Sequence, residues 1–469
     1  MIGSLRNNFR EGLLRFRSDG RYRELIRSSF FALVVRIAGV GTGFLVTLFT
    51  SRYFGADALG VVSICMAILS IACVISKLGL DIALLRDVSA FEVLEDYAFI
   101  KSIYLRAIKI IIPFSLLVTL VLYLSADWMA TYFFHKSYMA NVFRINAIFN
   151  VPLVLVSFHS ECLRGLKKIS AYSFYATTAA STLAVLLLIT AIIGIKFQLI
   201  PDDITTMKFL PVGIQFAAIL LAAVMAVLSW FYYSRILKQR KKNDGAAPGL
   251  LRTSLPIYTS TLMQLVMSWA PVLILGAFWP EASAGIFNAM VRISVVTNIA
   301  ILAVNSLSTP RFAVAFAGRN FEALRSQVRE STRLIFFASL PIFAALCIFP
   351  GTVLSVFGKD FPGNEWSLEL LLAGQFIAVF CGLPTQVLTM TNQQYALCNI
   401  AVFSAIVNVG SCYMLIPRYG IQGASLATIL GTFSWNMLCV FQVKRKFGFY
   451  TWFVSAVGKR NDSSAVEKL

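Results

Sequence analysis

Apolar runs of about 20 residues recur along the whole chain, and they constrain its fold more than any other feature. A helical run of that length crosses the hydrocarbon core of a bilayer, because each residue adds about 1.5 Å. A transmembrane β-barrel would instead show alternating segments of about ten residues, which the sequence lacks. With 58% hydrophobic and only 13% charged residues, the chain is predicted to be an all-α polytopic membrane protein.

The apolar runs predict twelve membrane spans. Their approximate ranges are 28–54, 59–80, 103–125, 143–161, 171–194, 209–233, 254–278, 285–307, 333–357, 365–390, 396–416 and 423–443. A basic and then Gly/Pro-rich segment separates the sixth span from the seventh. The predicted organisation is therefore a basic N-terminal tail (1–27), an N-lobe (28–233), a linker (234–253), a C-lobe (254–443) and a basic C-terminal tail (444–469).

Basic residues predict the orientation of the chain in the membrane. The loops on one side of the predicted spans hold about 30 of the 41 lysines and arginines, and such an excess marks the cytoplasmic side. Both terminal tails belong to this set, so both termini are predicted to be cytoplasmic. A net charge of +19 would indicate nucleic acid for a soluble protein. Here it fits membrane orientation and contact with anionic lipids instead.

The two predicted lobes resemble each other weakly in sequence. Aligning GVVSICMAI, from Gly60, with GIFNAMVRI, from Gly285, gives an offset of 225 residues. The same offset places RDVSAF on RFAVAF and makes five pairs coincide: Gly60/Gly285, Ile68/Ile293, Arg86/Arg311, Ala90/Ala315 and Phe91/Phe316. Transporters are often built from such repeats. We therefore expect two six-helix lobes that face each other across a cavity.

Arg36 is the first candidate for a functional charge. It lies about eight residues inside the first span, or about 12 Å along the helix axis. Its helical face continues through Val40, Gly43, Thr47 and Thr50, which are small or partly polar. Charges inside spans normally face a cavity or a partner. Arg36 is therefore expected either in the cavity or bound to backbone carbonyls or a carboxylate such as Asp81.

Further candidates lie in both lobes. Arg292 in the eighth span shares a face with Asn288, and the same two interpretations apply to it. Arg52 ends the first span, and Arg86 and Arg311 lie just inside the cytoplasm, where orientation alone also explains a positive charge. The seventh span begins LPIYTSTLMQLVMSWAP, a polar and proline-containing stretch in which a helix irregularity can serve binding or packing.

The sequence contains no pattern that indicates catalysis. We find no Ser/His/Asp arrangement, no P-loop, no usefully spaced paired carboxylates and no Cys/His metal spacing. We therefore predict a transporter and not an enzyme, with no cofactor and no metal. The predicted spans also lack a carboxylate near their middle, which a proton- or sodium-coupled exporter of organic cations usually needs.

Motifs at both ends of the chain resemble a known family. RIAGVGTGFLVTLFTSRYFGADALG and ISKLGLDIALLRDVSAF resemble the N-terminal hairpin of the polysaccharide flippases called Wzx. NQQYALCNIAVFSAI and IVNVGSCYMLIPRYGIQGASLATILGTFSW resemble the corresponding C-terminal hairpin. These flippases belong to the multidrug/oligosaccharidyl-lipid/polysaccharide (MOP) exporter superfamily, which includes the MATE drug exporters. The resemblance implies a V-shaped transporter with two six-helix lobes.

The resemblance also implies a function. It implies a protein of the bacterial inner membrane that moves an undecaprenyl-pyrophosphate-linked oligosaccharide to the periplasmic leaflet by alternating access. The product would serve O-antigen, lipopolysaccharide, capsule or exopolysaccharide synthesis, with a polymerase and a chain-length regulator as candidate partners. The pyrophosphate would bind at Arg36 and Arg292, with Arg52, Arg86 and Arg311 as further candidates. The sugar would contact Tyr258, Thr261, Gln264, Asn288 and Asn408.

Three other functions remain open at this stage. A drug/cation antiporter of the same fold would confer drug resistance when overproduced. A membrane polysaccharide polymerase or ligase would usually carry a sizeable outer loop, and the predicted outer loops are short. A scaffold in a polysaccharide assembly complex would need no internal charge.

Overall fold

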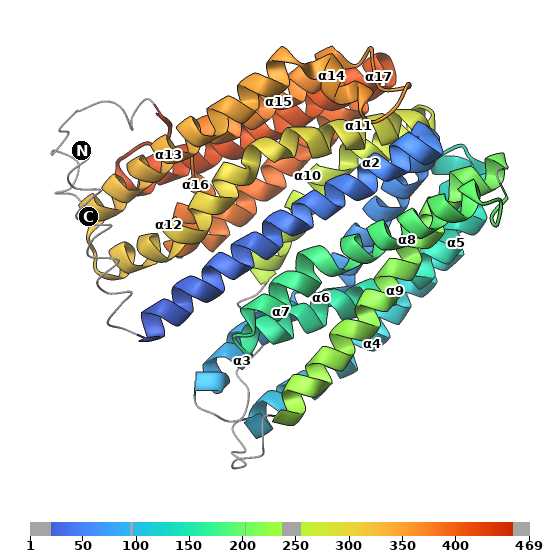
Figure 1. Cartoon of the computed structure of the whole chain (residues 1–469). Coiled ribbons are helices and arrows are strands. Elements are labelled where there is room, and N and C mark those ends of the chain that lie inside the picture. The colour runs from blue at the N-terminus through green and yellow to red at the C-terminus, as the bar shows by residue number, and fades with distance from the viewer. Residues whose placement is uncertain (1–19, 94–96, 202, 237–254, 454–469) are drawn as a thin grey trace.

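The computed structural model describes residues 20–93, 97–201, 203–236 and 255–453 (Figure 1). Within these ranges all the regular elements are helices. The N-lobe contains α2 (Gly20–Lys77), α3 (Leu80–Val93), α4 (Tyr97–Trp128), η1 (Met129–Phe133), η2 (Ser137–Met139), α5 (Ala140–Ile148), α6 (Asn150–Gly165), α7 (Ile169–Ser173), η3 (Phe174–Thr178), α8 (Ala179–Lys196) and α9 (Ile204–Ile236).

The described residues of the predicted C-lobe are also helical. It contains α10 (Leu255–Phe278), α11 (Glu281–Val295), η4 (Val296–Asn298), α12 (Ile299–Ala317), α13 (Phe321–Ile348), α14 (Pro350–Ser355), α15 (Glu365–Cys381), α16 (Pro384–Met390) and α17 (Gln394–Phe447). Most of the predicted tail 1–27, of the linker 234–253 and of the tail 444–469 lies outside the described residues.

Nine helices in the described ranges are long and apolar enough to cross a membrane, or ten if α15 and α16 form one span bent by 47°. The two longest each contain a break at a glycine. In α2, of 58 residues, Gly55 has a φ of 88°. In α17, of 54 residues, Gly420 has a φ of 54°. Glycine has no Cβ and adopts such positive φ values easily. Both breaks fall between spans that the sequence predicts as separate.

Two predicted loops are largely helical instead. The segment 77–101 contains α3, and 308–332 contains the end of α12 and the first turns of α13. Both stretches carry several charged residues, so their mean hydropathy is low. A helix with one polar face still buries its apolar face, however. In α13 this buried face includes Leu324, Val328 and Ile335. The mean hydropathy of the segment does not reveal this face.

The two lobes share one hydrophobic core at one end and have separate cores at the other. The shared core joins Phe134 and Phe216 of the N-lobe to Leu275 and Phe357 of the C-lobe. A second core around Phe158 uses N-lobe residues alone, and a third around Phe312 uses C-lobe residues alone. The molecule is therefore closed at the shared core, the closed end, and its lobes separate towards the open end (Figure 1).

At the closed end, α2 crosses α11 at two glycines. A Cβ on Gly60 would lie 1.9 Å from the Glu281 carbonyl oxygen, and one on Gly285 would lie 2.3 Å from that of Ala56. One turn further along, the Asn288 amide donates a hydrogen bond of 2.6 Å to the Ser63 hydroxyl. The pairs Ala56/Glu281, Gly60/Gly285 and Ser63/Asn288 all differ by 225 residues. Residues related by the predicted internal repeat therefore meet each other here, which supports that repeat.

A candidate anion site between the lobes

The Arg36 face of α2 is open at one end and buried at the other. Val40 is 36% exposed, and a Cβ on Gly43 would meet no atom within 4 Å. Nearer the closed end, Thr47 is 4% exposed and Thr50 is 0% exposed. The small, partly polar stripe thus lines open space beside α2 that ends where the lobes meet.

Arg36 lies at the open end of this stripe. Its side chain is partly buried, and its guanidinium lies close to the Tyr172 hydroxyl of α7. The carboxylate considered as its partner, Asp81, instead accepts a hydrogen bond of 2.6 Å from Lys77. None of the ion pairs within the described residues includes Arg36. Its positive charge therefore lies beside a neutral phenol and remains available to an anion.

Arg292 lies deeper and has no acidic partner among the described residues. It is exposed, yet protein atoms crowd around it and no charged neighbour acts on it. Arg292 follows Gly285 by seven positions on α11, which places it about 10 Å closer to the open end. It lies on the face of α11 that meets α2. A desolvated guanidinium without a carboxylate favours binding of an anion.

The other predicted arginines lie elsewhere. Arg52 donates a hydrogen bond of 2.9 Å to the Val356 carbonyl, which joins the lobes at the closed end. Arg86 in α3 forms an ion pair of 3.2 Å with Asp87, and Arg311 in α12 is exposed. Pyrophosphate contacts by these three residues stay predictions.

The polar residues of α10 divide into two groups. Thr261, Gln264 and Ser268 are exposed along one helical face, at spacings of three, four and seven residues. Tyr258 is partly buried where α10 meets the turn between α2 and α3. A Cβ on Gly79 would lie 2.9 Å from the Tyr258 Cβ. The exposed face can offer hydroxyl and amide groups to a sugar, whereas Tyr258 contacts the N-lobe.

Two predicted sugar-binding asparagines are buried in helix contacts. Asn288 is bonded to Ser63 in the α2–α11 crossing. Asn408 is 1% exposed and donates a hydrogen bond of 3.2 Å to the Ala427 carbonyl, which ties together the two parts of α17. Both amides therefore hold helices together in this conformation. Their predicted sugar contacts are not tested by these bonds.

A cluster of charges around Glu281 bridges the lobes at the closed end. Glu281 is 5% exposed. It lies 3.4 Å from the Lys136 amine and 3.7 Å from the Lys208 amine, and it accepts a hydrogen bond from the Tyr138 hydroxyl. Burial lowers the pKa of the Lys136 amine, although the Glu281 charge opposes that shift. These residues come from three distant segments, so no local pattern in the sequence predicts the cluster.

Glu281→Gln is expected to loosen the closed end, because it removes the negative charge that two lysines share across the lobes. Amide hydrogen exchange over 129–139 should become faster. Asp127→Asn is the matched control, since Asp127 pairs with Arg144 inside the N-lobe. Equal exchange in wild type and Glu281→Gln would show that the cluster does not hold the lobes together.

The fold defines a multi-span helical membrane protein of the MATE-like type. One solved structure, an inward-facing MATE multidrug transporter of the MOP superfamily, matches with a TM-score of 0.68 and 15% identity over 90% of this chain and 98% of that chain. A MOP superfamily transporter from Pyrococcus furiosus, for which reversed polarity of the binding pocket suggests a different function, matches with a TM-score of 0.62. Its identity is 16%, over 93% of this chain and 98% of that chain.

Sequence comparison identifies the family. The polysaccharide biosynthesis protein family matches residues 25–316, more than half of the chain, so the chain belongs to that family. A probable low-salt glycan biosynthesis flippase from Haloferax volcanii is 23% identical over 417 residues, which cover 87% of this chain and 81% of the relative. The predicted resemblance to polysaccharide transporters of the MOP superfamily is confirmed at this level.

Proposed function

We propose that this protein is a flippase for a lipid-linked oligosaccharide in surface polysaccharide synthesis. The observation that carries the proposal is Arg292, an exposed arginine inside a predicted span that has no acidic partner among the described residues. Family membership and the glycan flippase relative support the glycan part of the substrate. A diphosphate between lipid and sugar would be the negatively charged partner that Arg292 lacks among the described residues.

The two arginines give this substrate a path. Arg36 lies 19 residues from the Gly55 break, or about 28 Å from the closed end. Arg292 lies 11 residues from Glu281, or about 16 Å from that end. With a hydrocarbon core about 30 Å thick, Arg36 stands near the entrance and Arg292 near mid-membrane. The diphosphate would contact Arg36 first and then form a bidentate pair with the Arg292 guanidinium.

Lipid and sugar follow different routes in this proposal. The polyprenyl chain, undecaprenyl in bacteria, stays in the bilayer at a gap between the lobes. The sugar passes along the exposed face of α10, where Thr261 and Gln264 replace part of its hydration. The lobes then rock about the α2–α11 crossing, and the closed end opens once the Glu281 contacts separate.

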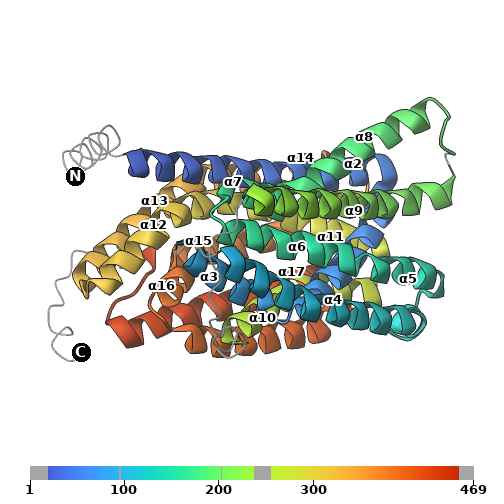
Figure 2. The ribbon, with the colours of Figure 1, turned by 90° about the horizontal axis from the view of Figure 1, so that it is seen from below.

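We also propose twelve spans with both termini in the cytoplasm. A straight helix of 54 residues would be about 80 Å long, far more than a bilayer needs. The breaks at Gly55 and Gly420 make α2 and α17 two spans each. The described start of α2 and the described end of α17 lie at the same end of the helical body (Figure 2). The distribution of basic residues places this end in the cytoplasm, and in a bacterium the membrane would be the inner membrane.

Reconstituted vesicles can test the proposal. The full-length protein should move a fluorescent polyprenyl-diphosphate oligosaccharide across the bilayer, measured as protection from a membrane-impermeant quencher. A cationic dye should not be exported, because the positive Arg292 repels it. Dye export driven by an ion gradient, without lipid translocation, would instead establish the drug/cation antiporter.

A further inference from the structure

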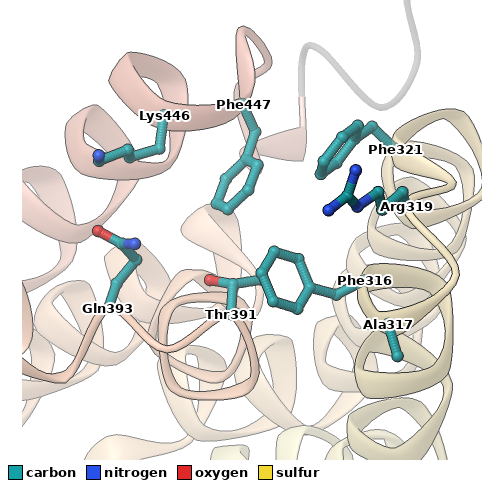
Figure 3. A pocket seen from close by; sticks show the side chains of 8 residues that line it. All are labelled: Phe316, Ala317, Arg319, Phe321, Thr391, Gln393, Lys446 and Phe447. Atoms are coloured by element: carbon teal, nitrogen blue, oxygen red, sulfur yellow. The ribbon is translucent and has the colours of Figure 1, made fainter. Parts of the chain in front are cut away.

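A pocket of 580 Å³ lies at the open end of the C-lobe, outside the interlobe space (Figure 3). Three aromatic rings line it: Phe316 from α12, Phe321 from α13 and Phe447 from α17. Their ring centroids lie 6.0 to 6.5 Å apart. Arg319, in the turn between α12 and α13, directs its guanidinium towards the rings of Phe321 and Phe447, and Lys446 lies at the opposite rim.

A row of arginines continues from this pocket along α13. Arg325 and Arg329 follow Phe321 at spacings of four and eight residues, so all three share one helical face. The chain after α17 runs beside the same helix. Phe447 contacts Phe321 at the start of this stretch, and Phe453 stacks on Phe336 at its end, with centroids 4.0 Å apart. The pocket and the two arginines therefore adjoin along one face of α13, and we call them together the C-lobe basic groove.

The charges in this groove have few partners in the protein. The Nε–H groups of Arg325 and Arg329 are buried and donate no hydrogen bond within the described residues, and the positive charge of Arg325 acts directly on Arg329. The nearby carboxylates, Glu322 and Glu330, are exposed and form none of the described ion pairs. Like charges one turn apart destabilise a helix. An anion with several oxygen acceptors would offset this repulsion.

The character of the surroundings indicates which anion fits. Further along α13, Leu334 is 58% exposed, Phe337 61% and Leu340 42%, as expected for a surface that contacts acyl chains. We propose that the C-lobe basic groove binds an anionic phospholipid of the cytoplasmic leaflet, with the phosphate at Arg325 and Arg329 and the glycerol end in the aromatic pocket.

Lipid binding to the purified full-length protein tests this proposal without any transport assay. Native mass spectrometry during titration with phosphatidylglycerol should show saturable binding that phosphatidylethanolamine does not reproduce. In Arg325→Gln/Arg329→Gln, half-saturation should require about 25-fold more phosphatidylglycerol, because each basic residue near an anionic lipid surface contributes about fivefold. Arg319→Gln and Lys446→Gln give a second measurement in the pocket if the double variant does not fold.

The matched control is Lys101→Gln/Arg106→Gln, which removes two exposed basic residues from α4 of the N-lobe. This variant should bind phosphatidylglycerol like wild type. An equal loss in the control, or wild-type binding by the groove variants, would overturn the proposal. Displacement of the lipid by an equal concentration of inorganic diphosphate would also overturn it, because the groove would then bind soluble phosphate and not a lipid.

Discussion

Replacing Arg292 with alanine is expected to reduce lipid-linked oligosaccharide translocation at least tenfold. A hydrogen bond to a charged group contributes about 1.5–3 kcal/mol, which corresponds to a loss of about 10- to 150-fold. No described neighbour can replace the guanidinium, because Arg292 has no charged residue acting on it. Translocation in reconstituted vesicles and surface polysaccharide in cells that lack the native gene would both measure the loss.

Three further variants make this result specific. Arg292→Lys should keep part of the activity, because lysine retains the charge but loses the bidentate geometry. Arg36→Ala should reduce translocation less than Arg292→Ala, since Arg36 acts at the entrance. Arg418→Ala, at an exposed arginine of α17, should translocate like wild type. Normal translocation by Arg292→Ala at an equal amount of protein would exclude Arg292 as the diphosphate site.

Gly60→Ala is expected to destabilise the whole protein, because its Cβ would lie 1.9 Å from the Glu281 carbonyl oxygen. The nearest atoms to this Cβ belong to the Glu281 backbone and not to a flexible side chain, so α2 and α11 have to move apart. Overpacking of this kind costs about 1–3 kcal/mol. The Tm of the purified protein should fall, and Gly285→Ala should have a similar effect on the other side of the same crossing.

Gly410→Ala provides the control for this prediction. A Cβ on Gly410 in α17 would meet no atom within 4 Å, and alanine favours a helix over glycine by about 1 kcal/mol. Its Tm should therefore stay the same or rise. If Gly60→Ala also left the Tm unchanged, the close crossing of the lobes would not hold in solution.

Local sequence patterns predict the helices and their approximate order well. The glycine breaks at Gly55 and Gly420 fall where the apolar runs separate. Low hydropathy misplaces the start of α13, although the spacing of Arg325, Arg329 and Arg333 already shows a basic helical face. That pattern is visible in the sequence, but assigning the segment to a loop hides it.

The roles of the polar residues depend on what surrounds each one. Asn288 and Asn408 have the same chemistry as a sugar-binding amide, yet the structure buries both in helix contacts. Arg36 and Arg292 are both arginines inside predicted spans, but Arg36 lies close to a tyrosine, whereas Arg292 has no charged neighbour in the described part of the chain. Sequence gives the type of side chain at a position, and tertiary contacts decide whether its hydrogen bonds are already used.

The sequence by itself determined that this chain is a helical membrane protein with an internal offset of 225 residues. The length of an apolar run and the spacing of its residues are properties of one segment. They can therefore be recognised without knowing which other segments pack against it. Only the tertiary structure decided which end is closed, which intramembrane arginine has no acidic partner among the described residues and which charges join the lobes. These features arise from residues far apart in the chain, such as Lys136, Lys208 and Glu281, whose contacts exist only after the helices pack.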